Sequence, residues 1–266
     1  MKLTMLGSGH AIVTEYYNTC YVIENDSNYL LVDGGGGSTL LTQLKHAGIN
    51  HNDIHHIFVT HKHIDHLLGI IWMMRIYCQG MKYGRFQGEA YIYGHEEVIR
   101  IIENISRQVL EPSETACIGK TLHLVTVNDG DTYNIIGKDV TFFDIHSKKS
   151  KQFGYCMDLG NGEKLTCCGD EPCYESSYPY VDNSKWLFHE AFCLYSQADI
   201  YKPYEKNHST VKDACELAER FNVKNILLYH TEDQTVGTRK ELYTKEGQRY
   251  HHGNIYVPDD LEVIEL

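Results

Sequence analysis

The stretch VTHKHIDHLLG, residues 59–69, places His61, His63, Asp65 and His66 within six positions. Imidazole and carboxylate groups are good ligands for borderline cations such as zinc. On one loop, His61 and His63 can turn one way while Asp65 and His66 turn another. Four ligands on a short loop exceed the need of one tetrahedral ion once other segments contribute, so this stretch predicts two metal ions. A solvated, histidine-rich surface loop is the alternative.

The residues around this motif predict an α/β arrangement in which strands deliver polar side chains to one rim. HIFVT (residues 56–60) is typical of a buried strand, and it ends immediately before His61. Several other strand-like runs also end in a polar residue, and parallel neighbours would bring these residues together. They are Asp33, His146, Asp170, His189 and His230.

Further elements follow from periodicity and capping. A helix is expected after Ser38 and before Gly48, and another at residues 67–78. An amphipathic helix over 95–109 should end at Pro112, and Thr210 with Asp213 has the spacing of a capping box that starts a helix. Strands are expected at 2–6, in a hairpin over 19–35, and at 122–127, 132–136, 139–145, 154–159, 163–168, 185–191 and 225–230.

Composition limits the classes of function. The chain has 266 residues, a net charge of −12 and nine cysteines without regular spacing. An acidic chain argues against a broad nucleic-acid surface, because phosphates are bound by Lys and Arg. The cysteines indicate free thiols in a reducing compartment. With no signal peptide and no apolar run that could span a bilayer, we expect a cytoplasmic protein without membrane contact.

These motifs resemble the metallo-β-lactamase superfamily. Its HxHxDH signature stands here as His61-Lys-His63-Ile-Asp65-His66, and Asp33 in LLVDGGGG matches its earlier Asp-Gly motif. The resemblance covers nearly the whole chain and implies an αββα sandwich that forms one domain over residues 1–266. It further implies that one metal is held by His61, His63 and His146, that the second is held by Asp65, His66 and His230, and that Asp170 bridges them. Cys167 and Cys168 are then core or supporting thiols.

Two later motifs are similar to the tRNase Z-like branch of that superfamily. WLFHEAFC (186–193) and KNHSTVKDACELAERF (206–221) look like its His-Glu-Ala and His-Ser-Thr motifs. The resemblance implies that Glu190 orients and charges His208, which assists the departing oxygen. The alternative is that His208 only lies near the start of a helix and that Glu190 lies at the edge of the core, with no role in catalysis for either residue.

Differences from that branch narrow the range of expected substrates. Only residues 147–169 separate His146 from Asp170, so the long arm that grips tRNA in true tRNase Z enzymes is missing. The family's Pro-x-Lys-x-Arg loop is also absent. Lys148, Lys149 and Lys151 are candidates for local phosphate docking, with a solvated loop as the alternative.

The leading hypothesis is a dinuclear phosphodiesterase that uses a metal-bound hydroxide, with Asp65, Glu190 and His208 as catalytic residues. Zinc is the expected metal, with manganese as the alternative. A small phosphodiester or a single-stranded nucleic acid is the expected substrate, and the tRNase Z-like branch, whose members often form dimers, allows a homodimer. Two alternatives remain: hydrolysis of a carbonyl substrate such as a lactone, a thioester or a β-lactam-like compound, and a non-catalytic metal- or nucleotide-binding role.

Overall fold

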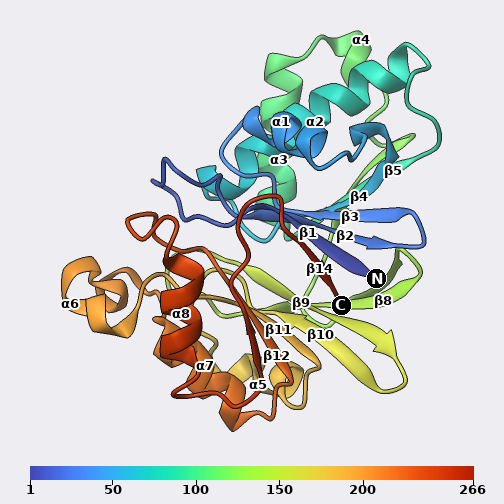
Figure 1. The fold of residues 1–266 in the computed structure, drawn as a ribbon. Helices are drawn as coiled ribbons and strands as arrows, with labels where there is room; N and C mark the ends of the chain where they lie inside the picture. The colour runs from blue at the N-terminus through green and yellow to red at the C-terminus, as the bar shows by residue number, and fades with distance from the viewer.

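A computed structural model describes all 266 residues and shows two stacked seven-stranded sheets with helices on both outer faces (Figure 1). The first sheet has the order β14-β1-β2-β3-β4-β5-β6 and the second the order β13-β12-β11-β10-β9-β8-β7. This is the αββα sandwich that the sequence predicted.

The first sheet combines antiparallel and parallel pairing. β14, β1, β2 and β3 pair antiparallel, whereas β3, β4, β5 and β6 run parallel. Its strands are β1 (Lys2–Gly7), β2 (Cys20–Asn25), β3 (Asn28–Val32), β4 (Ile54–Phe58), β5 (Ala90–Gly94), β6 (Leu122–Thr126) and β14 (Val263–Glu265).

The second sheet is built the same way. β7 to β10 form an antiparallel meander, and β10 to β13 run parallel. Its strands are β7 (Thr132–Ile135), β8 (Lys138–Asp144), β9 (Phe153–Gly160), β10 (Glu163–Cys167), β11 (Trp186–Glu190), β12 (Asn225–Tyr229) and β13 (Asn254–Tyr256). Because β10, β11 and β12 are parallel, their carboxyl ends lie at one edge.

Helices α1 to α4 cover the first sheet, and α5, α7 and α8 cover the second (Figure 1). They are α1 (Thr39–His46), α2 (Ile64–Lys82), α3 (Glu96–Val109), α4 (Pro112–Thr115), α5 (Tyr178–Val181), α6 (Ala198–Tyr201), α7 (Val211–Arg220) and α8 (Arg239–Gly247), with 3-10 turns η1 (His51–Asp53), η2 (Glu175–Ser177), η3 (Tyr195–Gln197) and η4 (Pro203–Lys206). None of these helices is both long and apolar enough to cross a membrane.

Three hydrophobic clusters hold the layers together. One cluster of 23 buried residues lies between the sheets, and includes Phe58 and Phe142, whose rings are 4.7 Å apart. A second cluster of 23 packs the first sheet against its helices, and a third of 14 packs the second sheet against α7 and α8. Burial of this apolar area, at about 25 cal/mol per Å², is the main force that joins the layers.

Most predicted elements are confirmed, with some shifts at their ends. The capping box of Thr210 and Asp213 starts α7. Ser38 stands at the N-cap of α1 but makes no capping hydrogen bond with its side chain. The helix expected at 67–78 begins earlier, at Ile64, and so contains half of the histidine motif. β5, β13, β14, α8 and the short helices α4, α5 and α6 were not predicted.

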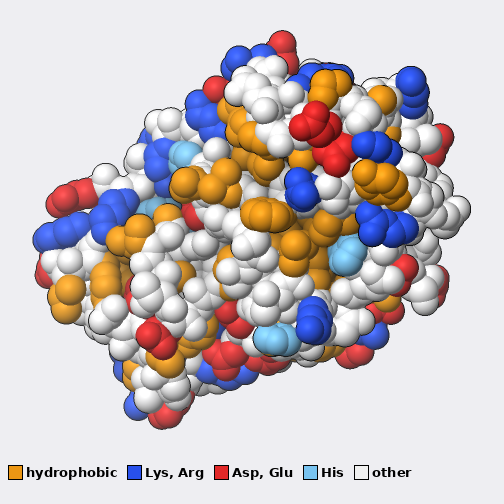
Figure 2. All heavy atoms as spheres, turned by 90° about the horizontal axis from the view of Figure 1, so that it is seen from above, with side chains coloured by type: hydrophobic (Ala, Val, Ile, Leu, Met, Phe, Trp, Pro, Cys, Tyr) orange, Lys and Arg blue, Asp and Glu red, His pale blue; other side chains and the backbone are white.

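Charged side chains are mixed over the surface seen from above the α1–α4 layer. Lys and Arg are interspersed there with acidic and hydrophobic side chains and form no single basic patch on this face (Figure 2). This agrees with the net charge of −12. The face offers no broad surface for a phosphate backbone.

Candidate metal centre

Four of the six polar residues predicted at strand ends, Asp33, His61, Asp170 and His230, meet at one edge of the sandwich. His146 does not reach it, and His189 is buried in β11 with Nδ1 2.7 Å from the backbone oxygen of Glu190, outside every ligand group. Asp33 follows β3, Asp170 follows β10, Glu190 ends β11 and His230 follows β12. Asp33 and His230 adopt left-handed backbone conformations, with φ of 56° and 57°. Such a conformation costs a non-glycine residue about 1–2 kcal/mol. Strain of this kind clusters at functional sites.

The histidine motif is held against this edge by a close glycine contact. The N–H of Gly34 donates to the carbonyl of His66 (2.8 Å), and the N–H of Gly69 donates to the carbonyl of Gly35 (3.0 Å). A Cβ atom on Gly69 would lie 1.8 Å from the Gly34 oxygen. The glycines of LLVDGGGG therefore let the first turns of α2 approach the end of β3.

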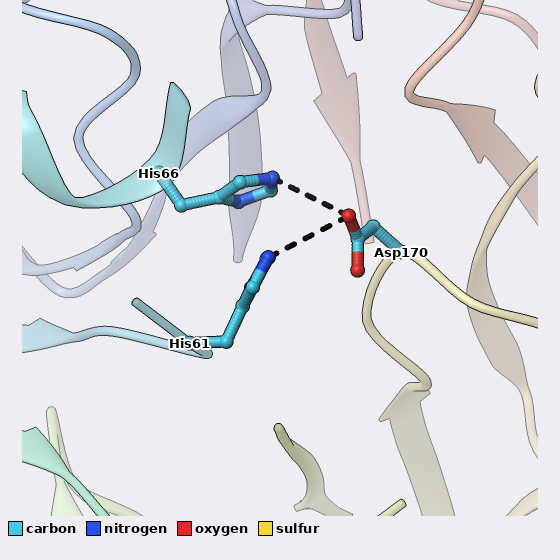
Figure 3. A group of neighbouring side chains, drawn as sticks. All are labelled: His61, His66 and Asp170. Carbon is cyan, nitrogen blue, oxygen red and sulfur yellow. Dashed lines mark ion pairs between the residues drawn. The ribbon is translucent and has the colours of Figure 1, made fainter. Parts of the chain in front are cut away.

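Asp170 lies at the centre of the assembled side chains. Its Oδ2 is 3.6 Å from Nε2 of His61 and 3.7 Å from Nε2 of His66 (Figure 3). The same oxygen is 3.5 Å from Nε2 of His230. A carboxylate with three imidazole nitrogens at this range has the arrangement expected of a shared metal ligand.

Two overlapping groups of ligand atoms result. His61, His66 and Asp170 form one, and Asp65, His66 and His230 form the other, with all atoms of a group within 4.8 Å of one another. Oδ2 of Asp65 lies 3.3 Å from Nε2 of His66 and 3.6 Å from Nε2 of His230. All five residues are buried. His63 joins them from the side, with Nδ1 2.7 Å from Nε2 of His61.

Unpartnered nitrogens test whether this site fits a metal. Nε2 of His66 and both ring nitrogens of His230 are buried without a hydrogen-bond partner. An unsatisfied buried polar group costs about 1–3 kcal/mol. Divalent cations would satisfy Nε2 of both rings, and the mixed imidazole and carboxylate donors suit them. The residues present therefore fit a metal site.

Burial and neighbouring charges favour the metal-binding protonation state of His61 and Asp170, but the opposite state of His66. Burial lowers the pKa of His61 well below its ordinary value, which keeps this imidazole neutral. Burial alone would raise the pKa of Asp170, but His61 and His230 outweigh it and hold this carboxyl ionised. For His66, burial opposes the charge, but Asp65 and Asp33 raise its pKa well above 6.5. Metal binding there displaces a proton.

His146 is not brought to the site, which corrects its assignment as a ligand of the first metal. Its side chain is 63% exposed, and its Nδ1 lies 3.9 Å from Oδ1 of Asp144. The residue has a φ of 56°, and its N–H donates to the same carboxylate (2.7 Å). This turn after β8 leaves the imidazole in solvent, outside both ligand groups.

Gln152 lies at the site instead and was missed from the sequence. Its Nε2 donates to Oδ1 of Asp170 (2.7 Å) and lies 3.1 Å from Nδ1 of His61. Gln152 is buried. Gly169, with a φ of 75°, makes room for it, because a Cβ atom there would lie 2.8 Å from the amide nitrogen. A glutamine in SKKSKQFGY carries no metal signal of its own.

Glu190 and His208 lie together beside His230, and the three form a further group of ligand-type atoms. Oε2 of Glu190 is 3.4 Å from Nδ1 of His208. The other Glu190 oxygen accepts a hydrogen bond from the N–H of Ser209. The ring of Phe192 stacks on His208 at 4.7 Å and 8°, which fixes the plane of the imidazole.

The pKa values of this pair are shifted in opposite directions. Burial raises the pKa of Glu190 to about 8. Burial, and then the charge of Lys149, lower the pKa of His208 to about 4. Both shifts favour neutral side chains, a protonated Glu190 carboxyl and an uncharged His208 imidazole, so the expected charging of His208 by a Glu190 carboxylate is not seen. Such a pair can hold or release a proton next to the metal ligands.

The three candidate lysines have different surroundings. Nζ of Lys149 lies 3.3 Å from Nε2 of His208, so it reaches the site. Nζ of Lys148 lies over the ring of Tyr174, 4.9 Å from its centroid. Lys151 lies over Phe153 and 4.0 Å from Asp144, away from the ligands.

Cys167 and Cys168 are buried and belong to neither ligand group. The Cys167 thiol accepts a hydrogen bond from the hydroxyl of Tyr21 (3.3 Å) and contacts that of Tyr229 (3.4 Å). Cys168 packs in the cluster beneath α7. Both act as core thiols.

Comparisons with known proteins place this site in a family. The chain is 23% identical to ribonuclease Z of Azobacteroides pseudotrichonymphae over 86% of this chain and 87% of that protein. It is 24% identical to ribonuclease Z of Nanoarchaeum equitans over 98% and 92% of the two chains.

Solved structures share the fold across the whole chain. The metallo-β-lactamase fold protein YhfI of Bacillus subtilis superposes with a TM-score of 0.79 at 18% identity, covering 100% of this chain and 99% of that one. The short form of human tRNase Z gives a TM-score of 0.74 at 21% identity over 100% and 99%.

The ligand groups and these relatives together make the chain a metal-dependent hydrolase. The model of a family described as "Anti-Pycsar protein Apyc1" matches residues 1–249. The chain therefore belongs to the Apyc1 family of anti-Pycsar proteins, among the tRNase Z-like members of the metallo-β-lactamase superfamily.

Proposed function

We propose that this protein is a two-metal phosphodiesterase that hydrolyses a small phosphodiester. The observation that carries the proposal is the Glu190–His208 pair, 3.4 Å apart and beside the ligand His230. Hydrolysis of a lactone or a β-lactam does not need a second proton-handling pair at this place. Departure of an alkoxide from phosphorus does, because the leaving oxygen must gain a proton.

In this proposal each residue has a defined role. His61, His63, Asp65, His66, Asp170 and His230 hold two divalent ions, with zinc as the first choice and manganese as the second. When bound, such ions activate water and neutralise charge on phosphoryl oxygens. Asp65 accepts a proton from the attacking water. His208, oriented by Glu190 and Phe192, donates its Nε2 proton to the leaving oxygen, and the protonated Glu190 carboxyl replaces it by giving its own proton to Nδ1.

The connections in the second sheet favour a small substrate and argue against folded tRNA as the substrate. Almost all of residues 153–167 belong to β9 and β10, which pair as a hairpin. Only a short loop, residues 145–152, separates β8 from β9. No room remains for an arm that could grip tRNA at a distance. A cyclic mononucleotide, a dinucleotide or a short single strand fits this lack of an extended surface.

The test measures hydrolysis of bis(p-nitrophenyl) phosphate, cyclic mononucleotides and dinucleotides by zinc- or manganese-loaded protein. His208→Ala should lower kcat by about 10²–10⁴-fold, the usual contribution of a general acid. Its metal content should stay near two per chain. His46→Ala, which removes an exposed histidine on α1, is the control.

Two results would refute the proposal. One is a fully metallated wild-type protein that cleaves no diester but hydrolyses a lactone or thioester, since this would favour carbonyl chemistry. The other is an unchanged kcat in His208→Ala. The homodimer and the cytoplasmic location stay predictions.

A further inference from the structure

The loop between β8 and β9 is hydrogen-bonded to one buried carboxylate next to the metal centre. This carboxylate has no role in the proposed hydrolysis. Glu171 directly follows Asp170, and only 1% of its surface is exposed. Its Oε1 accepts hydrogen bonds from Oγ of Ser147 (2.5 Å) and the N–H of Lys149 (3.3 Å). Its Oε2 accepts from the N–H of Lys148 (3.1 Å) and the hydroxyl of Tyr174 (3.2 Å).

These four hydrogen-bond donors show that Glu171 has a different role from the candidate metal ligands. Both of its oxygens are occupied by the loop and by Tyr174, and it belongs to neither ligand group. A buried charge is stable only when it is paired or fully hydrogen-bonded. Four donors meet this need. Glu171 is therefore committed to holding residues 147–149 and not to binding an ion.

The loop is stiffened further from inside and by contacts with the ligands. Oγ of Ser147 accepts hydrogen bonds from the N–H groups of Lys149 and Ser150, both at 3.1 Å. Oγ of Ser150 lies 3.4 Å from Nε2 of His63. The loop is thus pinned at both ends, by Glu171 on one side and by the histidine motif on the other.

Only one of the two lysines held in this way faces the reaction centre. Nζ of Lys149 lies 3.3 Å from Nε2 of His208, whereas Nζ of Lys148 packs over Tyr174. The Lys149 side chain is exposed, and the backbone that Glu171 holds sets its direction. Charge-assisted hydrogen bonds to phosphoryl oxygens are the strong ones, and lysine binds phosphate as a point charge.

We infer that Lys149 binds a non-bridging phosphoryl oxygen of the substrate and that Glu171 is the positioning residue that aims it. This inference rests on the proposed phosphodiesterase function and names the contact that recognises the substrate's anion. In a protein with a net charge of −12, a lysine held at the site supplies positive charge where the substrate's phosphoryl group would bind.

The experiment measures the affinity of the zinc-loaded protein for inorganic phosphate by calorimetry, together with KM and kcat for bis(p-nitrophenyl) phosphate. Lys149→Met should weaken phosphate binding by about tenfold or more, as expected for loss of a charged hydrogen bond. Lys148→Met removes the same charge from the neighbouring position and should change it less than about twofold. Lys149→Arg should recover much of the affinity.

Glu171→Gln should weaken phosphate binding and raise KM, while the metal content stays near that of the wild type. Since Glu171 acts through Lys149, adding Glu171→Gln to Lys149→Met should cause no further loss. Tyr174→Phe removes one of the four donors without changing charge and should have a smaller effect. It keeps the test open if Glu171→Gln does not fold.

The outcomes separate this inference from the proposed function. Phosphate binding that is unchanged in Lys149→Met, or additive losses in the double variant, would overturn the inference. Loss of metal from Glu171→Gln would also overturn it, because Glu171 would then act on Asp170. If the phosphate results hold but the wild type cleaves no diester, the inference about anion binding stands and the proposed reaction fails.

Discussion

Oδ2 of Asp33 lies 2.7 Å from Nδ1 of His66, and the two residues, 33 positions apart in the chain, are both buried. The same carboxylate accepts hydrogen bonds from the N–H and the hydroxyl of Thr60, each at 2.8 Å. Asp33 thereby ties the end of β3 to the residue before His61 and to the first turn of α2. It also leaves Nε2 of His66 as the nitrogen that faces the ligand group.

Asp33→Asn should therefore weaken metal binding without removing a ligand. Loss of a carboxylate that orients a ligating histidine typically costs about 10–100-fold in metal affinity. Competition with a zinc chelator would measure this. Asp199→Asn, which changes an exposed carboxylate on α6, should leave the affinity unchanged. An unaltered affinity in Asp33→Asn would show that the Thr60 contacts alone hold the motif.

The contact between α2 and the end of β3 yields a second prediction. In an exposed helix interior, replacing glycine by alanine stabilises a protein by about 1 kcal/mol. Gly69→Ala should do the reverse here, since its Cβ would meet the Gly34 carbonyl oxygen at 1.8 Å. A loss of about 1–3 kcal/mol is expected from such overpacking.

Urea denaturation of the two proteins would measure the loss. Gly37→Ala is the matched control, because a Cβ atom there has no neighbour within 4 Å and Gly37 belongs to the same glycine-rich segment. A Gly69→Ala protein that is as stable as the wild type would mean that α2 can shift away from β3 at little cost.

The positions of His146 and Gln152 give the third prediction. His146→Ala should leave metal content and kcat close to wild type, because the imidazole is in solvent. Gln152→Ala should lower activity, since it removes the hydrogen bond to Asp170 and the contact with His61. Metal analysis and turnover of both variants would check this pair. Loss of one metal from His146→Ala would show that the turn after β8 reverses when metal binds.

These two residues mark the limit of prediction from sequence. The histidine motif, Asp170 and His230 could be found because metal chemistry restricts the residue types and parallel strands bring their ends to one edge. His146 met the same criteria. Its direction depends on a left-handed turn and on a hydrogen bond to Asp144, and neither is encoded by residue type alone.

Elements with a local signal were predicted, and those without one were not. α7 has both a capping box and an apolar face, so its start at Val211 followed from the sequence. β13 and β14 are three residues each, and they exist only because β12 and β1 offer an edge to pair with. Glu171 gave no signal for the same reason, since its partners come from a loop more than twenty residues earlier.

The last prediction concerns stability against acid at a histidine outside the metal centre. His56 on β4 is half-buried and lies beside the rings of Tyr91 (5.5 Å, 13°) and Tyr93 (6.1 Å, 17°), which are 6.3 Å from each other. Burial, and then the neighbouring His55, lower the pKa of His56 to about 4 from 6.5. Between these values the unfolded chain binds a proton that the folded chain does not, so stability must fall as pH falls from 6.5 towards 4.

His56→Phe keeps an aromatic ring in the stack and removes the titration. Metal-free protein would be unfolded with urea at several pH values, so that loss of metal does not shape the curve. The free energy of unfolding of the variant should decline less steeply below pH 6.5 than that of the wild type, and the two curves should run parallel above it. His46→Gln, at an exposed position of α1, should follow the wild-type curve. Equal slopes for His56→Phe and wild type would mean that the stacked ring is protonated as readily in the folded protein as in the unfolded chain.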